Sequence, residues 1–273
     1  MSTLLAGCDF SSSPSPRKPI VFATGALERG RVQLHGLHEA QTLQAYAQWL
    51  QRDQPWICGF DFPFGLPREL IEHLGWPLNW LDCMRHYASL GRAQIAQTFA
   101  AFCAARPAGG KFAHRAADRP AGSSPSMKWI NPPVAFMLHA GVPLLRQAGV
   151  HLPGLCEGDR RRVALEAYPG LLAREVLGRR SYKSDDPARQ DAARAAARAE
   201  LVQALQDGLP RWGLRLSLTP AQAQALCEEP RGDALDALLC LWQAAWAAQQ
   251  HAQGHPCWGL PPFDPLEGWI VGA

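Results

Sequence analysis

The sequence predicts an α/β fold in which helices cover a mixed, five-stranded β-sheet. Short apolar segments with the character of buried strands occur at 3–10, 19–24 and 56–60. The early strands follow one another through short connections, which is typical of an antiparallel meander. The strand at 56–60 is reached through a helix, and a strand reached in this way is often parallel to an earlier one. A mixed sheet therefore fits the order of the elements.

The first part of the chain contains three of these strands. The first, at 3–10, is followed by a turn-forming run of serine and proline, and the second covers 19–24. A third strand is expected at 31–37, where apolar and polar residues alternate. Residues 39–53 form an amphipathic helix that leads to the fourth strand at 56–60.

The middle of the chain departs from the sheet pattern. Residues 68–150 are expected to form a helical and loop insertion, with helices at 79–90, 92–106 and 130–145. The segment 107–125 is rich in Gly, Ala, Arg and Ser. It is predicted to be either a partly mobile lid or a solvated loop.

The last part of the chain returns to alternating strands and helices. A fifth strand is expected at 163–168, stopped by Pro169, with a helix near 171–177 after it. Long helices are predicted at 183–206 and 232–250. Thr219-Pro220 has the form of a helix start, with an N-cap residue followed by proline at the first helical position. Residues 263–270 are expected to form a final extended segment.

Length and composition favour one domain over residues 1–273 with the insertion inside it. The formal net charge of +3 permits nucleic-acid binding but is too small to argue for it. Eight cysteines include no C-x-x-C pair, which argues against a zinc knuckle or a thioredoxin-like motif. Cys8, Cys58 and Cys240 lie in apolar runs and are expected to be core residues.

The chain reads as a cytoplasmic protein without membrane contact. Its early apolar stretch, Leu4–Cys8, is too short for a signal peptide and has no basic residues before it. No apolar run approaches the length of a transmembrane helix.

Two aspartates mark the ends of predicted strands. Asp9 ends the first strand and Asp61 ends the fourth, where proline and glycine then stop regular structure. If these strands are parallel neighbours, both carboxylates lie at the same edge of the sheet, where α/β proteins bind ligands. The structural alternative is that Asp61 only caps its own turn.

Two further aspartates occupy the start of the last long helix. Asp233 and Asp236 are three residues apart, so they point to one side of that helix. Clustered carboxylates repel one another, and Mg²⁺ or Mn²⁺ removes that penalty. Two such ions, roughly 3.5–4 Å apart, can promote hydrolysis of a phosphodiester. Asp233 alone is also a favoured N-cap residue.

Glu166 and several basic residues are further candidates. Glu166 lies in the predicted strand at 163–168, where it is either another metal ligand or faces the opposite side and pairs with an arginine. Phosphate contacts are expected from Lys183, Arg194, Arg198 and Arg115. For the helical members the alternative is a solvated face. The sequence contains no H-E-x-x-H, G-x-S-x-G or P-loop motif.

Several short motifs together resemble the domain-of-unknown-function family 429, a family of predicted RNase H-like nucleases. The resemblance spans nearly the whole chain. Its motifs are Gly7-Cys8-Asp9, Asp61-Phe62-Pro63-Phe64-Gly65-Leu66-Pro67, Glu166-Ala167-Tyr168-Pro169, Gly232-Asp233-Ala234-Leu235-Asp236-Ala237 and Glu267-Gly268-Trp269-Ile270. The resemblance implies an RNase H-like core with catalytic acids on the first strand, the fourth strand and a late helix. Those positions match Asp9, Asp61, Asp233 and Asp236.

Three functions follow as hypotheses. The first is a Mg²⁺- or Mn²⁺-dependent nuclease that acts on a nucleic acid or, given the modest charge, on a small phosphorylated substrate. The second is a nucleotide-binding or phosphotransfer protein, because related ATPases and sugar kinases place an aspartate before a hydroxyl-rich turn like Asp9-Phe10-Ser11-Ser12-Ser13. The third is a non-catalytic binding module on the same core.

Overall fold

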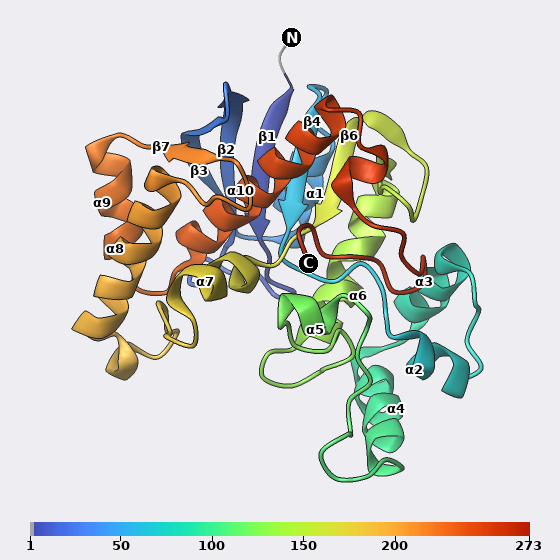
Figure 1. Cartoon of the computed structure of the whole chain (residues 1–273). Coiled ribbons are helices and arrows are strands. Elements are labelled where there is room, and N and C mark those ends of the chain that lie inside the picture. Colours follow the sequence, from blue (N-terminus) through green and yellow to red (C-terminus); the bar gives the residue numbers. More distant parts are fainter. Residues whose placement is uncertain (1–2) are drawn as a thin grey trace.

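The computed structural model describes residues 3–273 and has an α/β architecture with one mixed sheet (Figure 1). The seven strands lie in the order β5-β6-β4-β1-β2-β3-β7. Five strands were predicted, so the predicted number was wrong. The two additional strands, β5 (Val150–His151) and β7 (Arg215–Ser217), lie at the edges of the sheet and have two and three residues. Such short pairings leave no periodic pattern in the sequence.

The central strands have the predicted arrangement. An antiparallel meander forms from β1 (Leu4–Asp9), β2 (Ile20–Glu28) and β3 (Arg31–Ala40). The helix α1 (Leu43–Leu50) then leads to β4 (Trp56–Phe60), which pairs with β1 in parallel. On the other side of β4 lies β6 (Asp159–Glu166), also parallel.

The two faces of the sheet bury separate apolar cores. Along β1, Ala6 and Cys8 point into the core beneath α1 and α6 (Val134–Gln147), whereas Leu5 points into the core beneath the last long helix. This alternation is the two-residue period of a strand that is buried on both faces. Cys8, Cys58 and Cys240 are buried and free, as predicted for core residues.

The helix α10 (Asp233–Ala252) lies directly on β1 and β4 (Figure 1). Two glycines make this close approach possible. A Cβ atom at Gly7 would lie 2.0 Å from the backbone nitrogen of Leu241, and one at Gly59 would lie 2.5 Å from the carbonyl oxygen of Cys240. Because these glycines are direct partners in the parallel pair, the helix backbone fits into a shallow groove across both strands.

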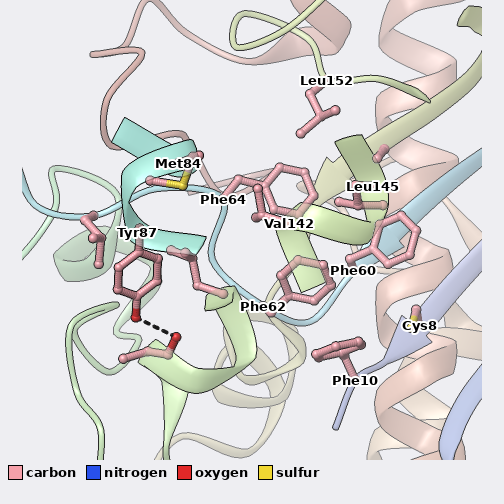
Figure 2. Packing of buried hydrophobic residues seen from close by; sticks show 14 of the residues in the cluster. Cys8, Phe10, Phe60, Phe62, Phe64, Met84, Tyr87, Val142, Leu145 and Leu152 are labelled. Carbon is pink, nitrogen blue, oxygen red and sulfur yellow. Dashed lines mark hydrogen bonds between the residues drawn. The ribbon is translucent and has the colours of Figure 1, made fainter. Parts of the chain in front are cut away.

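Most of the insertion lies beyond the carboxyl ends of the central strands, in the lower part of Figure 1, and its last helix packs with α1 against one face of the sheet. Its helices are α2 (Arg68–His73), α3 (Trp80–Ser89), α4 (Arg92–Ala104), α5 (Asp118–Ala121) and α6 (Val134–Gln147). Phe62 and Phe64, which follow Asp61, join this insertion to the sheet (Figure 2). The ring of Phe62 lies 4.6 Å from that of Phe10 and 5.4 Å from that of Phe64. The turn after β4 is therefore anchored by aromatic packing.

The segment 107–125 has two parts: residues 107–111 are exposed, as predicted for a solvated loop, whereas the part from Ala113 onward is largely packed into the protein. Arg115 and Asp118 within it are 3% and 0% exposed, and Ala113, Ala117 and Ala121 are buried. The composition of the segment is typical of a surface loop. Its burial was not predictable from that composition, because the partners of its small and charged residues lie far away in the sequence.

The remaining helices are α7 (Pro169–Leu177), α8 (Ala192–Asp207) and α9 (Pro220–Glu228). Thr219 caps α9, as predicted. The helix predicted at 183–206 begins only at Ala192, where the Asp191 side chain caps it by accepting a hydrogen bond from the Arg194 backbone. Residues 181–186 instead form an irregular segment. The tail at 263–270 forms no strand, although Val271 next to it donates a backbone hydrogen bond to Glu166.

Within residues 3–273, no helix combines the length and the apolar character that a membrane span requires.

Candidate metal centre

Three carboxylates converge at the carboxyl ends of the central strands. Asp9, Asp61 and Asp236 each offer an oxygen atom, and these oxygens all lie within 4.8 Å of one another. The pairing of Cys8 with Phe60 places Asp9 and Asp61 level with each other, and the Asp61 amide donates a 2.9 Å hydrogen bond to the Cys8 carbonyl. The structure thus brings together three of the four predicted acids.

Strand alternation sets the face on which these side chains lie. Asp9 follows Gly7 by two residues and Asp61 follows Gly59 by two, so both carboxylates share the face that α10 covers. The close contact at the two glycines then brings the first turn of α10 down onto this edge. Asp236 lies in that turn and is fully buried.

The cluster is electrostatically costly in the absence of a metal ion. Burial and then repulsion by Asp236 raise the pKa of Asp61 to about 7, with Lys183 acting in the opposite direction. The pKa of Asp9 is also well above its usual value, through burial first and the neighbouring carboxylate of Asp236 second. A positive charge next to these two carboxyl groups would therefore favour their ionised forms.

Asp236 has two polar partners from the irregular segment before α8. The Tyr182 hydroxyl and the Lys183 ammonium group both donate hydrogen bonds to its carboxylate. Burial by itself would lower the pKa of Lys183, but the carboxylate of Asp236 outweighs that effect and the pKa is raised. Lys183 is thus a cation at the base of the site.

Asp233 lies one turn away from the cluster and borders the same cleft. The N-cap of α10 is Gly232, with φ of 76°, so Asp233 is the first helical residue and does not cap the helix. Its carboxylate is 3.7 Å from the Arg231 guanidinium, and its Oδ2 atom is buried without a hydrogen bond. Burial and the neighbouring Glu229 raise the pKa of Asp233. The structure does not bring it into the group of three.

Glu166 lies on the other side of the sheet edge and pairs with an arginine. It aligns with Phe60, one residue before Asp61, so strand alternation turns it away from the cluster. Its oxygens accept hydrogen bonds from Arg115, at 2.6 and 2.9 Å, and from the Phe64 amide at 2.9 Å. Of the two predicted roles, pairing with an arginine is the one that the structure contains.

Arg115 is fully used in this buried ion network. It also donates hydrogen bonds to Asp118 and to the Glu267 carbonyl. Burial opposes its positive charge, but Glu166 and Asp118 outweigh that effect and raise the pKa of Arg115. Arg115 lines the cleft, so its phosphate contact stays a prediction, but in this structure all of its donors hold the insertion and the tail against the turn that follows Asp61.

Of the other three predicted phosphate contacts, one lines the cleft and two have partners elsewhere. Lys183 borders the cleft, whereas Arg194 pairs with Asp191 at the start of α8, at 2.7 Å. Arg198 is buried and donates hydrogen bonds to the carbonyls of Cys227 and Tyr182. It is neither a phosphate contact nor part of a solvated face: it supports the segment that carries Tyr182 and Lys183.

The three clustered carboxylates line a cleft of about 940 Å³. Its walls carry further basic residues, namely Lys18, Arg174, Arg179, Arg180 and Arg231. Ser11 and Ser12, from the turn after β1, border it beside Asp9. Sequence reasoning missed this basic wall and Tyr182. The run Gly178-Arg179-Arg180-Ser181-Tyr182-Lys183 was the available signal, but it was partly assigned to a helix.

The donor set fits a hard divalent cation. All three clustered groups are carboxylates, the ligands that Mg²⁺ and Mn²⁺ prefer, and no histidine or cysteine belongs to the group. Two of the three have raised pKa values that a bound cation would reverse. Asp9, Asp61 and Asp236 are therefore the residues that would hold such an ion.

Comparison with known proteins places the chain in a family. The family described as "Protein of unknown function (DUF429)" matches residues 17–258, a range that includes Asp61 and Asp236 but begins after Asp9. Searches among curated proteins and among solved structures gave no match. Because the family match covers most of its length, the chain belongs to the family of proteins of unknown function DUF429.

Proposed function

We propose that the protein is a Mg²⁺- or Mn²⁺-dependent phosphodiesterase that cleaves nucleic acid. One observation carries this proposal: three carboxylates from two adjacent strands and a helix converge in a cleft that basic side chains also line. Clustered acids bind metal, and basic side chains bind phosphate. Phosphodiester hydrolysis is the reaction that uses both at one place.

The topology supports an RNase H-like core as part of this proposal. The strand order β3-β2-β1-β4-β6, the antiparallel meander and the crossover through α1 agree with the arrangement that the motif resemblance implies. The acids also lie on the implied elements, namely the first strand, the end of the fourth strand and a late helix. Fold by itself does not determine function, so the proposal depends on the site.

The chain's own residues would each have a role in this reaction. Asp9, Asp61 and Asp236 would hold the ions in the cleft. A bound Mg²⁺ or Mn²⁺ ion supplies Lewis acidity and a water of lowered pKa. Arg179, which is exposed and lines the cleft, would orient the phosphate chain, whereas Arg180 is paired with Glu200 at 2.6 and 2.7 Å. The anchored turn after Asp61 would keep the carboxylates in place.

The basic wall favours a phosphate-rich polymer despite the small net charge of the chain. Cations gathered in one cleft attract a polyanion more strongly than the same number spread over the surface. A small phosphorylated substrate is the alternative within the same chemistry. Competition by inorganic phosphate or a mononucleotide at low micromolar concentration would favour the small substrate.

The first experiment is a Mn²⁺ titration by calorimetry. We expect binding by the wild type and its loss in Asp61→Asn, with Asp53→Asn as a matched control because Asp53 is exposed and lies outside the cleft. Single- and double-stranded DNA and RNA are then offered with Mn²⁺. Cleavage that is unaffected by Asp9→Asn and Asp61→Asn would refute the proposal.

A second function, phosphotransfer with a nucleotide, is favoured by the serines that border the cleft beside Asp9. However, Arg92 already donates hydrogen bonds to the hydroxyls of Ser12 and Ser13, at 2.8 and 3.2 Å. Tight binding of ATP in the same calorimetric experiment would rank this function first. Absence of any Mg²⁺ or Mn²⁺ binding would favour a non-catalytic binding module.

A further inference from the structure

Lys183 reaches the acid cluster from a firmly held segment. Its neighbour Tyr182 accepts a hydrogen bond from Arg198 at its carbonyl, and the Ser184 amide donates one to the Pro230 carbonyl. The Lys183 side chain also lies against the start of α10, where a Cβ atom at Gly232 would be 2.8 Å from that of Lys183. The backbone of Lys183 is therefore fixed beside the helix that carries Asp236.

The Lys183 side chain, in contrast, is partly exposed to the cleft. The Lys183 side chain is 40% exposed, whereas Asp236, its partner, is 1% exposed. Lysine carries its charge on a flexible four-carbon stem, so the ammonium group can leave the carboxylate without movement of the backbone. Lys183 lines the same cleft as the basic residues of its wall.

Lys183 also occupies an oxygen atom that a metal ion would need. Its ammonium group contacts Oδ2 of Asp236, and the Tyr182 hydroxyl contacts Oδ1. Among residues 3–273, it is the one cationic side chain that forms an ion pair within the group of three carboxylates. It thus supplies the positive charge that a divalent cation would otherwise bring.

We propose that Lys183 is a tethered counter-ion: it stabilises the acid cluster before metal binds, and the metal displaces it into the cleft toward substrate phosphate. This inference rests on the proposed metal-dependent function, but its test does not depend on catalysis. The displaced ammonium group would stay within reach of the phosphate that the ions hold. One lysine would therefore serve both states of the site.

The test compares Lys183→Met with Lys18→Met, which removes the same charge from another part of the cleft. Without a competitor at Asp236, Mn²⁺ should bind Lys183→Met about tenfold more tightly than wild type in calorimetry, since one charge-assisted hydrogen bond no longer has to break. Lys18→Met should change the affinity by no more than about twofold, because Lys18 is exposed to solvent and pairs with Asp185 rather than with any of the three clustered carboxylates. Lys183→Gln provides a second variant if Lys183→Met folds poorly.

Stability without metal gives an independent result. In EDTA, Lys183→Met should lower the midpoint of thermal unfolding of the otherwise wild-type protein. Added to Asp236→Asn, where the charge pair no longer exists, the same substitution should change the midpoint by no more than about 1 °C. If the wild type binds Mn²⁺ and the variants Lys183→Met and Lys18→Met bind it with equal affinity, the role of Lys183 is overturned and the metal-dependent function is not. No Mn²⁺ binding in any variant overturns the proposed metal-dependent function as well.

Discussion

Neutralising Asp61 should stabilise the metal-free protein, although it destroys the proposed metal site. The pKa of about 7 for this carboxyl group, against 3.8 for an unperturbed aspartate, means that ionisation is disfavoured in the folded state. At about 1.4 kcal/mol per pKa unit, the cost of the charge is ~4 kcal/mol once the pH is well above 7. Asp61 is partly accessible to solvent, so we expect a gain of about 2–4 kcal/mol in the free energy of unfolding for Asp61→Asn.

The sign of the pH dependence follows from the direction of the shift. Between pH 4 and pH 7 the folded protein keeps a proton on Asp61 that the unfolded chain has lost, so stability falls as the pH rises through this range. The advantage of Asp61→Asn is therefore small near pH 4 and complete above pH 7.

Urea unfolding in EDTA at pH 4.5 and pH 8, followed by circular dichroism, measures this difference. Asp53→Asn is the control, because Asp53 is exposed and should give wild-type stability at both values. Saturating Mn²⁺ should reverse the order of stability at pH 8, since only the wild type gains binding energy. Equal stability of Asp61→Asn and wild type at pH 8 in EDTA would refute the argument that the cluster is under electrostatic strain.

Three other predictions follow from the same structure. Gly59→Ala should cost about 3 kcal/mol of stability, because its Cβ atom meets the α10 backbone, whereas Gly110→Ala, with 3.9 Å to its nearest neighbour, should be close to neutral in the same urea assay. Arg115→Met should cost ~3–5 kcal/mol by leaving Glu166 and Asp118 buried without a cation, whereas the 40%-exposed Arg68 should cost less than ~1 kcal/mol when changed to Met. Mn²⁺ affinity, measured by calorimetry, should rise from pH 6 to pH 8 as Asp61 loses its proton, and an affinity that is flat across this range would contradict its role as a ligand.

Alternation along the strands made much of the fold predictable. The pattern of β1 and β4 identified both as buried strands and placed an aspartate at the end of each, and the intervening helix made them parallel neighbours. The first turn of α10 was recognisable from its apolar periodicity and its preceding glycine. These features are local, so the residues that create them are close together in the chain.

Other features depend on contacts between distant residues. Whether Asp233 or Asp236 joins the cluster depends on where α10 crosses Gly7 and Gly59, which is a matter of backbone contact. The role of Glu166 depends on its alignment with Phe60, since a shift of one residue would turn it to the other face.

The sequence by itself determined the strands, the long amphipathic helices and the acidic character of the candidate site, because hydrophobic periodicity and residue chemistry are carried by each segment alone. Only the tertiary structure decided that Arg115 is a buried partner of Glu166, 51 residues away, and that Lys183 faces Asp236, 53 residues away. A charged side chain has no preferred partner in the sequence. Its role is set by which opposite charge the packed elements bring within reach after both have been removed from water.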